Sequence, residues 1–472
     1  MKFGTSGLRG LSTELKGNAS SVFAAAFGLY LTRAGLAEEG QDIVIGQDFR
    51  DSSPDIAANC KRALSTLGFK IVDCGPVPTP ALALYAQTLG AAALMITGSH
   101  IPADRNGIKF YRPDGEIGKA DEQPILTLAE ELRQSGFQAK DGCIASDRRA
   151  ACEGLFFERN ANILAPNALA GMRIGVFEHS SVARDLIKGV LSHFGANVVA
   201  LGRSESFVPV DTEALSPEFI QCFESWTRDL KLDAIVSTDG DGDRPLVVDE
   251  RGKPLRGDLL GLVAAKFLNA ETVVTPVTSN SGIERAGSYT VIRTRVGSPY
   301  VIEGMSSALQ SAAQAVIGFE ANGGLLTGSD FVVHNHRLKA LPTRDSFLPI
   351  LSVLSQVAST GRPLSAISDS FRLPYATAGR LENFPIESSR KLMSYLQARV
   401  ENVSCFLASV GAVESLSSAD GLRIVLRDER IIHFRPSGNA PEMRCYVEAE
   451  NEAAAEQLLS AGLTQILTWC AS

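Results

Sequence analysis

Short apolar runs alternate with longer amphipathic segments along most of the chain. Runs of about 4–8 apolar residues bounded by turn residues predict buried strands, and apolar positions three and four apart predict helices. The first round of this pattern predicts helices over 20–39, 53–68 and 79–90 and strands over 42–48, 70–75 and 92–97. Such alternation is typical of an α/β protein whose mostly parallel sheet has helices on both faces.

The pattern restarts twice, at Met172 and near Gly257. The second round predicts a helix over 181–195 and strands over 172–178, 197–202 and 232–238. The third predicts a helix over 257–268 and strands over 272–277 and 315–320. The end of the chain differs, because it predicts a hairpin over 421–435, a strand over 445–450 and a helix over 452–469. We therefore expect a smaller α+β domain at the C-terminus.

Three stretches share one plan, in which a short apolar strand leads into a polar loop with glycine. They are "AALMITGSHIP", "DAIVSTDGDGD" and "QAVIGFEANGG". Repetition of one α/β unit would produce this likeness, and so would ordinary strand-to-loop chemistry. Ligands of open α/β sheets bind beyond the carboxyl ends of the strands, so the three loops are the first candidates for a site.

Composition and charge narrow the class of protein. With 472 residues, 45% of them hydrophobic, we expect a soluble protein of roughly two to four domains. The net charge of −8 argues against nucleic acid as a partner, although a few arginines can still form a pocket for a small anion. The eight cysteines include no Cys-x-x-Cys pair, no secretory leader follows Met1, and the most apolar helical stretch is interrupted by Arg33. These features predict a cytoplasmic protein without a membrane segment.

The stretch "STDGDGDRP" places Asp239, Asp241 and Asp243 at alternate positions with only glycines between them. Three carboxylates in a tight loop repel one another unless a cation lies among them, and hard oxygen ligands suit Mg²⁺ or Ca²⁺. A calcium EF-hand is excluded, because Arg244 stands where that loop needs glycine and the flanks read as strands. An acidic surface turn is the alternative. With three carboxylates, Mg²⁺ would take a further oxygen, typically from a phosphate.

The stretch "FRPSGNAPEMR" sets arginines around a Ser-Gly-Asn turn. The guanidinium of Arg435, the hydroxyl of Ser437, Asn439 and the backbone amides near Gly438 could together bind an anion. A plain turn with surface arginines is the alternative. The stretch therefore indicates a phosphate site only in combination with other signals.

Two further loops carry polar groups whose role the local sequence leaves open. Glu320 and Asn322 could hydrogen-bond vicinal sugar hydroxyls, although many α/β loops contain such residues. Ser99, beside His100, could be a nucleophile, a helix cap or an ordinary loop residue. The stretch lacks the Gly-x-Ser-x-Gly elbow of serine hydrolases, and Pro102 and the Asn-Gly that follows it interrupt any helix that Ser99 would cap.

Taken together, these stretches resemble the motifs of the α-D-phosphohexomutases, the family of phosphoglucomutase, phosphomannomutase and phosphoglucosamine mutase. "FGTSGLRG" and "IGQDFRDSSP" resemble the N-terminal motifs of that family, and "TGSHIPADRNGIKFY" resembles its phosphoserine loop. "DGDGDR" matches its metal loop, and "RPSGNAP" approaches its phosphate loop. The motifs follow the family's order over nearly the whole chain. The resemblance implies three similar α/β domains with mixed sheets, over 1–148, 149–252 and 253–370, and a smaller C-terminal α+β domain over 371–472, around a central cleft.

The resemblance also implies a phosphoryl-transfer site. Ser99 would carry the phosphoryl group, and Asp239, Asp241 and Asp243, with an oxygen on Ser99, would hold one Mg²⁺. The phosphoserine would pass its group to a hexose monophosphate, and the resulting sugar bisphosphate would turn over and return its other phosphate. A hexose 1,6-bisphosphate is the expected activator.

Further residues take roles by the same resemblance. Arg9 and Lys109 would lie near the transferring group, with Lys109 preferred as acid or base because neighbouring cations lower a lysine pKa. His100 would position the serine loop, and Arg244 would brace the metal loop. The substrate contacts would come from Glu320, Asn322, Arg435, Ser437, Gly438 and Asn439.

The sequence departs from the family pattern at some of these contacts. Asn322 and Gly324 stand where bacterial relatives often have serine and histidine, and Gly98 replaces an alanine in the serine loop. His334 and His336 could supply the missing imidazole, although solvated loop histidines are the alternative. The catalytic groups are kept while substrate contacts vary, so the reaction class is better specified than the sugar.

The expected substrate is a phosphosugar. Mannose and glucose differ only at carbon 2, away from the hydroxyls that Glu320 would read, so we expect activity on both, with mannose phosphate as the main substrate. Glucosamine phosphate is the alternative sugar. A metal-dependent sugar phosphatase and an inactive binding scaffold are the alternatives from other classes, and either a monomer or a homodimer is expected.

Overall fold

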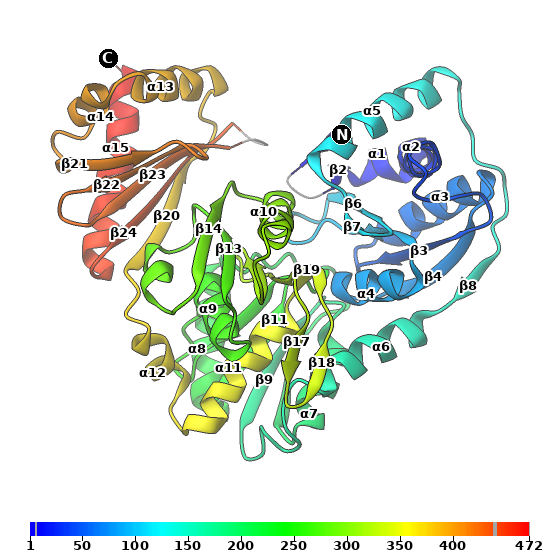
Figure 1. Cartoon of the computed structure of the whole chain (residues 1–472), viewed down its shortest axis with the longest axis horizontal. Coiled ribbons are helices and arrows are strands. Elements are labelled where there is room, and N and C mark those ends of the chain that lie inside the picture. Colours follow the sequence, from blue (N-terminus) through cyan, green and yellow to red (C-terminus); the bar gives the residue numbers. More distant parts are fainter. Residues whose placement is uncertain (5–6, 438–440, 472) are drawn as a thin grey trace. The chain divides into compact units, whose positions relative to one another are not determined.

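The computed structural model describes residues 1–4, 7–437 and 441–471, which form two compact units. One unit comprises Met1–Val273 and Gly297–Ser370, and the other comprises Val274–Val296 and Phe371–Ser472. Figure 1 labels the elements of both units along the chain. The domain boundaries at 148, 252 and 370 stay predictions.

The first sheet has the strand order β1-β2-β6-β5-β3-β4-β8, with β7 paired to β6. Its strands are β1 (Lys2–Phe3), β2 (Leu8–Leu11), β3 (Asp42–Gln47), β4 (Lys70–Pro76), β5 (Ala92–Ile96), β6 (Arg105–Arg112), β7 (Gly115–Glu116) and β8 (Ala145–Asp147). Its helices are α2 (Ser20–Arg33), α3 (Ser53–Thr66), α4 (Thr79–Leu89), α5 (Lys119–Gln134) and α6 (Arg149–Ala161), preceded by the short α1 (Ser12–Glu14) and a π-helical turn (Leu15–Ala19).

Both faces of this sheet are covered by helices (Figure 1). Ile43 and Ile45 of β3 lie in a core built with α2, α3 and α5, whereas α4 packs over the opposite face beside Gly46. Because each face is buried, the strand reads as one continuous apolar run in the sequence. The strands β3, β4 and β5 were predictable for this reason.

The second and third sheets repeat the order of four strands within the first sheet, which read from β4 is β4-β3-β5-β6. The second sheet is β10-β9-β11-β12 and the third is β14-β13-β15-β16-β19. In each round the third strand (β5, β11, β15) is followed by an antiparallel neighbour (β6, β12, β16). The bounds are β9 (Arg173–His179), β10 (Asn197–Arg203), β11 (Ala234–Thr238), β12 (Pro245–Val248), β13 (Thr272–Pro276), β14 (Thr290–Thr294), β15 (Val316–Phe319), β16 (Leu325–Thr327) and β19 (Leu341–Asp345). The sheets are therefore mixed, as the resemblance implied: the strands β3, β4 and β5 and the strands β9, β10 and β11 pair in parallel as expected, and β6 and β12 join them as antiparallel neighbours.

The remaining elements of the first unit are helices and one hairpin. The helices are α7 (Arg184–His193), α8 (Pro217–Leu230), α9 (Gly257–Phe267), α10 (Ser298–Gln310), α11 (Phe347–Thr360) and α12 (Leu364–Ser370), and the hairpin is β17 (Phe331–Val333) with β18 (His336–Leu338). Within the described part of the chain, no helix is both long enough and apolar enough to cross a membrane.

Two predicted helices are shorter in the structure. The helix expected over 20–39 ends at Arg33, because Gly35 takes φ of +67° and reverses the chain. The helix expected from Ser181 begins at Arg184, since the hydroxyl of Ser181 hydrogen-bonds Thr238 at the end of β11 and the N–H of Val182 donates to Gly240 in the loop that follows. The spacing of apolar residues alone reveals neither the turn at Gly35 nor the hydrogen bonds of Ser181 and Val182.

The second unit contains an antiparallel sheet of order β20-β24-β23-β22-β21. The predicted hairpin, strand and helix are present as β22 (Leu422–Leu426), β23 (Ile431–Pro436), β24 (Met443–Ala449) and α15 (Glu452–Ala471). The other elements of this unit are β14, β20 (Tyr375–Leu381), β21 (Val413–Ser417), α13 (Ile386–Ala398), α14 (Val400–Phe406) and a 3-10 turn (Ser281–Arg285). A core of its own supports this smaller α+β fold.

Candidate active site

Three loops, one from each of the first three sheets, meet within the first unit. They follow β5, β11 and β15. The hydroxyl of Ser99 donates a hydrogen bond to Oδ2 of Asp239 at 2.5 Å, which joins the first loop to the second. Arg344 of β19 donates to both Asp243 and Glu320, which joins the second loop to the third. The predicted serine, metal and sugar loops therefore form one site.

Ser99 has a left-handed backbone conformation, with φ of +54°, that non-glycine residues rarely adopt. Its N–H donates to Oγ1 of Thr97 at 2.7 Å, and its carbonyl oxygen accepts from Arg50 at 2.9 Å. Such a conformation costs on the order of 1–3 kcal/mol and persists only where surrounding contacts impose it. These contacts hold Ser99, which is 2% exposed, with its hydroxyl against the carboxylate loop.

Arg50 supports the serine loop, and the sequence analysis missed it. Its side chain is 1% exposed and pairs with Asp48 at 3.2 Å. Its guanidinium donates to four loop carbonyls at 2.6–2.9 Å, those of Ser99, Ile101, Pro102 and Arg105. A Cβ atom on Gly98 would lie 2.7 Å from Cζ of Arg50, so a side chain at position 98 would displace the guanidinium from the place it occupies here.

Replacing Arg50 by lysine is expected to lower kcat by about 100-fold, because one ammonium cannot bond four carbonyls and Ser99 would lose its position. Steady-state kinetics on a hexose 1-phosphate measure the effect, and Mg²⁺ binding should stay near that of the wild type. Arg133→Lys, on the surface of α5, is the matched control and should change little. A wild-type kcat for Arg50→Lys would contradict this role.

The three aspartates fit a divalent cation. One carboxylate oxygen from each of Asp239, Asp241 and Asp243 lies within 4.8 Å of the other two, and all three residues are buried. The Oδ1 atoms of Asp241 and Asp243 are buried without a hydrogen-bond partner, which is costly in a protein interior. Unpartnered carboxylate oxygens converging on one place are the donors that hard cations prefer. This group can therefore bind a metal ion, and the Ser99 oxygen lies next to it.

The pKa values of Asp239 and Asp243 are shifted in opposite directions. Burial, together with the charges of Asp241 and Asp243, raises the pKa of Asp239 well above its ordinary value. Burial also disfavours the charge of Asp243, but Arg344 and Lys109 outweigh it and lower the pKa of that carboxyl. A cation placed among these carboxylates would stabilise their ionised forms further.

Lys109 lies on β6 opposite Met95 and reaches the metal loop. Its Nζ donates to Oδ2 of Asp241 and Oδ2 of Asp243, each at 2.5 Å. Burial disfavours the charged amine, but these two carboxylates outweigh it and raise the pKa of Lys109 above its ordinary value. The expectation of a lowered lysine pKa is therefore wrong, because the nearest groups are carboxylates rather than cations. Lys109 serves here as an ammonium counter-charge.

His100 follows Ser99 in the serine loop, and Arg9 lies on β2. Burial, together with Arg244 and Arg344, lowers the pKa of Arg9 to about 10, so the guanidinium stays charged at neutral pH. Nδ1 of His100 is 3.2 Å from Oγ of Ser99. Burial and the nearby arginines lower the pKa of His100, which keeps the ring neutral. A neutral ring can hydrogen-bond the serine hydroxyl without adding a charge.

The other predicted side chains of this unit are Arg244, His334 and His336. Arg244 is nearly buried and faces the metal loop, with Nε 4.0 Å from Oδ2 of Asp239 and Nη1 3.7 Å from Glu213. His334 and His336 are exposed on the β17–β18 hairpin. The structure thus places Arg244 beside the metal ligands and gives the two histidines a solvated position.

Arg344 organises the sugar loop, and the sequence analysis missed it too. Glu320 is 6% exposed, and its Oε2 accepts from Nη1 of Arg344 at 3.1 Å. The other end of the guanidinium donates to Oδ2 of Asp243 from Nε at 2.9 Å and from Nη2 at 2.7 Å. Asn322 turns the loop by accepting from the N–H of Gly324 at 2.9 Å. A lone arginine within a short β-strand gives no local signal of these contacts.

The predicted phosphate-loop residues belong to the second unit. Nε of Arg435 forms an ion pair with Oδ1 of Asp420 at 2.9 Å. The N–H of Ser437 donates to the carbonyl of Glu442 at 2.9 Å. Gly438 and Asn439 lie outside the described residues. Phosphate binding by this loop stays a prediction.

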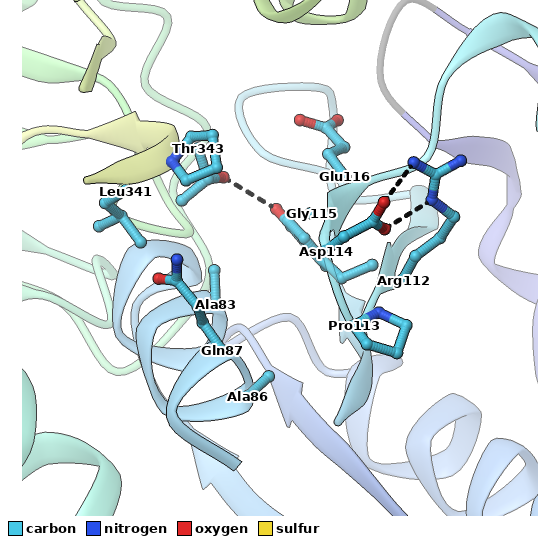
Figure 2. Close-up of a pocket in the computed structure, with 12 residues that line it drawn as sticks. Ala83, Ala86, Gln87, Arg112, Pro113, Asp114, Gly115, Glu116, Leu341 and Thr343 are labelled. Carbon is cyan, nitrogen blue, oxygen red and sulfur yellow. Dashed lines mark hydrogen bonds and ion pairs between the residues drawn. The ribbon is translucent and has the colours of Figure 1, made fainter. Parts of the chain in front are cut away.

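A separate pocket lies between α4, the β6–β7 turn and β19 (Figure 2). Ala83 and Ala86 form one wall, and Arg112, paired to Asp114 at 2.8 Å, forms the other. Among its described lining residues there is none of the predicted catalytic or metal-binding residues. The pocket borders Thr343, the neighbour of Arg344 in the chain, and we assign it no catalytic part.

Comparisons with known proteins agree with this architecture. Models of the phosphoglucomutase/phosphomannomutase family match in chain order: alpha/beta/alpha domains I, II and III match 1–135, 156–252 and 256–373, and the C-terminal domain matches 383–461. A phosphomannomutase of Sinorhizobium fredii is 52% identical over 98% of each chain. A phosphoglucosamine mutase of Sorangium cellulosum is 30% identical over 95% of this chain and 89% of that one. The crystal structure of a phosphoglucomutase/phosphomannomutase family protein from Burkholderia thailandensis superposes with a TM-score of 0.76 at 19% identity, covering 98% of this chain and 97% of the other.

Proposed function

Because the chain belongs to the phosphoglucomutase/phosphomannomutase family, we propose that it interconverts hexose 1-phosphate and hexose 6-phosphate through a phosphorylated Ser99. The observation that carries this proposal is the position of Ser99. Its backbone lies in the left-handed region, and its hydroxyl oxygen lies 2.5 Å from Oδ2 of Asp239, which belongs to a buried cluster of three aspartates. Phosphoryl transfer depends mainly on positioning and on neutralising the charge of the phosphoryl oxygens. This site provides the fixed oxygen of Ser99 and several positively charged side chains.

The reaction exchanges one phosphate ester for another. The bond between phosphorus and Oγ of Ser99 breaks, a bond between phosphorus and the free sugar hydroxyl oxygen forms, and the proton of that hydroxyl ends on Oγ of Ser99, which regenerates the serine hydroxyl. The sugar 1,6-bisphosphate then turns over in the site and returns its other phosphoryl group to Ser99. Added hexose 1,6-bisphosphate should therefore activate the dephosphorylated protein.

Residues of the first unit would bind the metal ion, offset the phosphoryl charge and position Ser99. Asp239, Asp241 and Asp243, with the Ser99 oxygen, would hold Mg²⁺, which when bound makes the serine oxygen a better leaving group. Arg9 and the protonated Lys109 offset the charge on the transferring phosphoryl oxygens. The neutral ring of His100 and the four carbonyl bonds of Arg50 keep Ser99 in place.

The second unit would hold the phosphate that does not react. We assign this to Arg435, Ser437, Gly438 and Asn439, which would bind one phosphate while Glu320 and Asn322 contact the sugar hydroxyls. We further propose a cytoplasmic enzyme, either monomeric or homodimeric, that acts on a phosphosugar.

Mannose phosphate is the proposed main substrate. The 52% identity to a phosphomannomutase, against 30% to a phosphoglucosamine mutase, supports this choice. The pairing of Glu320 supports it as well, because its carboxylate already accepts from Arg344 at 3.1 Å. A carboxylate that is bonded to a guanidinium attracts the ammonium group of glucosamine less than a free carboxylate does.

A comparison of mannose, glucose and glucosamine 1-phosphates tests the sugar assignment. Under identical Mg²⁺ and bisphosphate we expect kcat/KM values for mannose and glucose within about tenfold of each other, since the two differ only at carbon 2, and a lower value for glucosamine. A preference for glucosamine 1-phosphate of about tenfold, equivalent to roughly 1.4 kcal/mol in the transition state, would overturn the assignment to mannose.

A further inference from the structure

Arg344 connects the metal loop with the sugar loop through one side chain. It lies on β19, is 5% exposed, and bonds a carboxylate of each loop. Two of its nitrogens donate to Oδ2 of Asp243, and the third donates to Oε2 of Glu320. Among the described residues, it is the side chain that bonds both Glu320 and a member of the aspartate cluster.

The sugar loop is shaped around this arginine. A Cβ atom on Gly324 would lie 2.5 Å from Cδ, 2.7 Å from Cγ and 3.0 Å from Cβ of Arg344. Gly324 has no need of a left-handed conformation, since its φ is outside that region. The absence of a side chain at position 324 is therefore explained by the space that Arg344 occupies.

The two carboxylates are each left with one oxygen for other partners. In the described structure Glu320 is bonded through Oε2, so Oε1 is available to a hydroxyl group. Oδ2 of Asp243 accepts from Arg344 and Lys109, so Oδ1 is the oxygen without a hydrogen-bond partner. The guanidinium thereby leaves one oxygen of each carboxylate for another partner, which under the proposed function is the sugar for Glu320 and the metal ion for Asp243.

We infer that Arg344 is a positioning residue that aligns the sugar-reading carboxylate of Glu320 with the metal-binding carboxylate of Asp243. This inference rests on the proposed function. Arginine suits the task because its planar fork can bond two carboxylates at fixed angles, whereas a lysine ammonium is a single point charge on a flexible stem. Sugar recognition and the metal site are then set by the same side chain.

The first test compares Arg344→Lys with the wild type on mannose 1-phosphate and its 4-deoxy analogue. The wild type should discriminate against the analogue by about tenfold or more, because the analogue leaves Glu320 unpaired. Arg344→Lys should lose about 100-fold in kcat/KM on mannose 1-phosphate, and its discrimination against the analogue should fall to within about threefold. It should also need a higher Mg²⁺ concentration for half-maximal rate.

Two further variants separate positioning from general damage. Glu320→Gln should lose the discrimination between the two sugars while keeping the wild-type Mg²⁺ requirement. Arg337→Lys alters an exposed arginine paired to Asp330 and should match the wild type throughout. If Arg344→Lys slows both sugars equally, or changes only the sugar discrimination or only the Mg²⁺ requirement, the coupling role is wrong. Wild-type conversion of the 1-phosphate to the 6-phosphate tests the proposed function separately.

The steric part of the inference has its own test. Gly324→Ala should lose most activity in the wild-type background, because the new methyl group displaces Arg344. In an Arg344→Ala background the same change should cost at most about twofold more, since the space is then empty. Thermal unfolding and circular dichroism confirm that each variant folds. Equal losses from Gly324→Ala in both backgrounds would contradict the packing argument.

Discussion

Replacing Ser99 by alanine is expected to lower turnover by about 10⁴-fold or more, which is the effect expected when the group that carries the covalent intermediate is removed. The fold should survive, because Ser99 contributes one hydroxyl bond to Asp239 while Arg50 holds the loop through backbone carbonyls. Loss of the hydrogen bond from Ser99 to Asp239 predicts a modest loss of thermal stability. Mg²⁺ binding should persist, since all three aspartates remain.

Discontinuous assay of hexose 6-phosphate together with titration calorimetry of Mg²⁺ measures both parts of this result. Ser135→Ala, on the exposed end of α5, is the matched control and should behave like the wild type. A Ser99→Ala protein that turns over at a tenth of the wild-type rate would remove the phosphoserine from the mechanism. A complete loss of Mg²⁺ binding would show that Ser99 supports the metal loop and not only the reaction.

Replacing Asp241 by asparagine is expected to weaken Mg²⁺ binding by at least about 100-fold and to remove most turnover. The change keeps the size of the side chain but removes a charge at a buried position where Oδ1 has no other partner. Oδ2 accepts from Thr79 and Lys109 at 2.5 Å, and an amide can accept only through its oxygen. The variant should therefore disturb the metal loop without emptying the space it fills.

The measurement is Mg²⁺ titration by calorimetry, followed by kcat at saturating Mg²⁺. Asp229→Asn, which alters an exposed surface ion pair, serves as the control for loss of one carboxylate. A rate for Asp241→Asn near that of the wild type would refute the three-carboxylate site. An unchanged Mg²⁺ affinity with a lost rate would assign Asp241 to the reaction rather than to the metal.

The sequence predicted the loops whose chemistry is local. Asp239, Asp241 and Asp243 could be grouped because glycines bring three carboxylates together within one turn. Ser99 needed the resemblance, since its partner Asp239 lies 140 positions away. The role of Arg344 could not be predicted for the same reason, because its partners lie on two loops that only the folded chain brings together. Long-range contacts of this kind leave no periodic signal.

The charge environment was the part that sequence reasoning got wrong. Lys109 lies near arginines in space, but its closest neighbours are the carboxylates of Asp241 and Asp243, which raise its pKa. The strand that carries Lys109 was also missed, because β6 contains polar and charged side chains among its apolar ones. Residues that face an active site interrupt the alternation by which a strand is recognised.

The central claim is that Ser99 carries the phosphoryl group and gives it to a sugar rather than to water. Incubation with mannose 1,6-bisphosphate and Mg²⁺, followed by peptide mass spectrometry and then by addition of mannose 1-phosphate, tests it directly. We predict one phosphoryl group on Ser99, which is still present after mannose 1-phosphate is added because each cycle returns one to the serine, with hexose 6-phosphate formed and almost no inorganic phosphate released. Rapid release of inorganic phosphate without any 6-phosphate, or a phosphoryl group on another residue, would contradict the account.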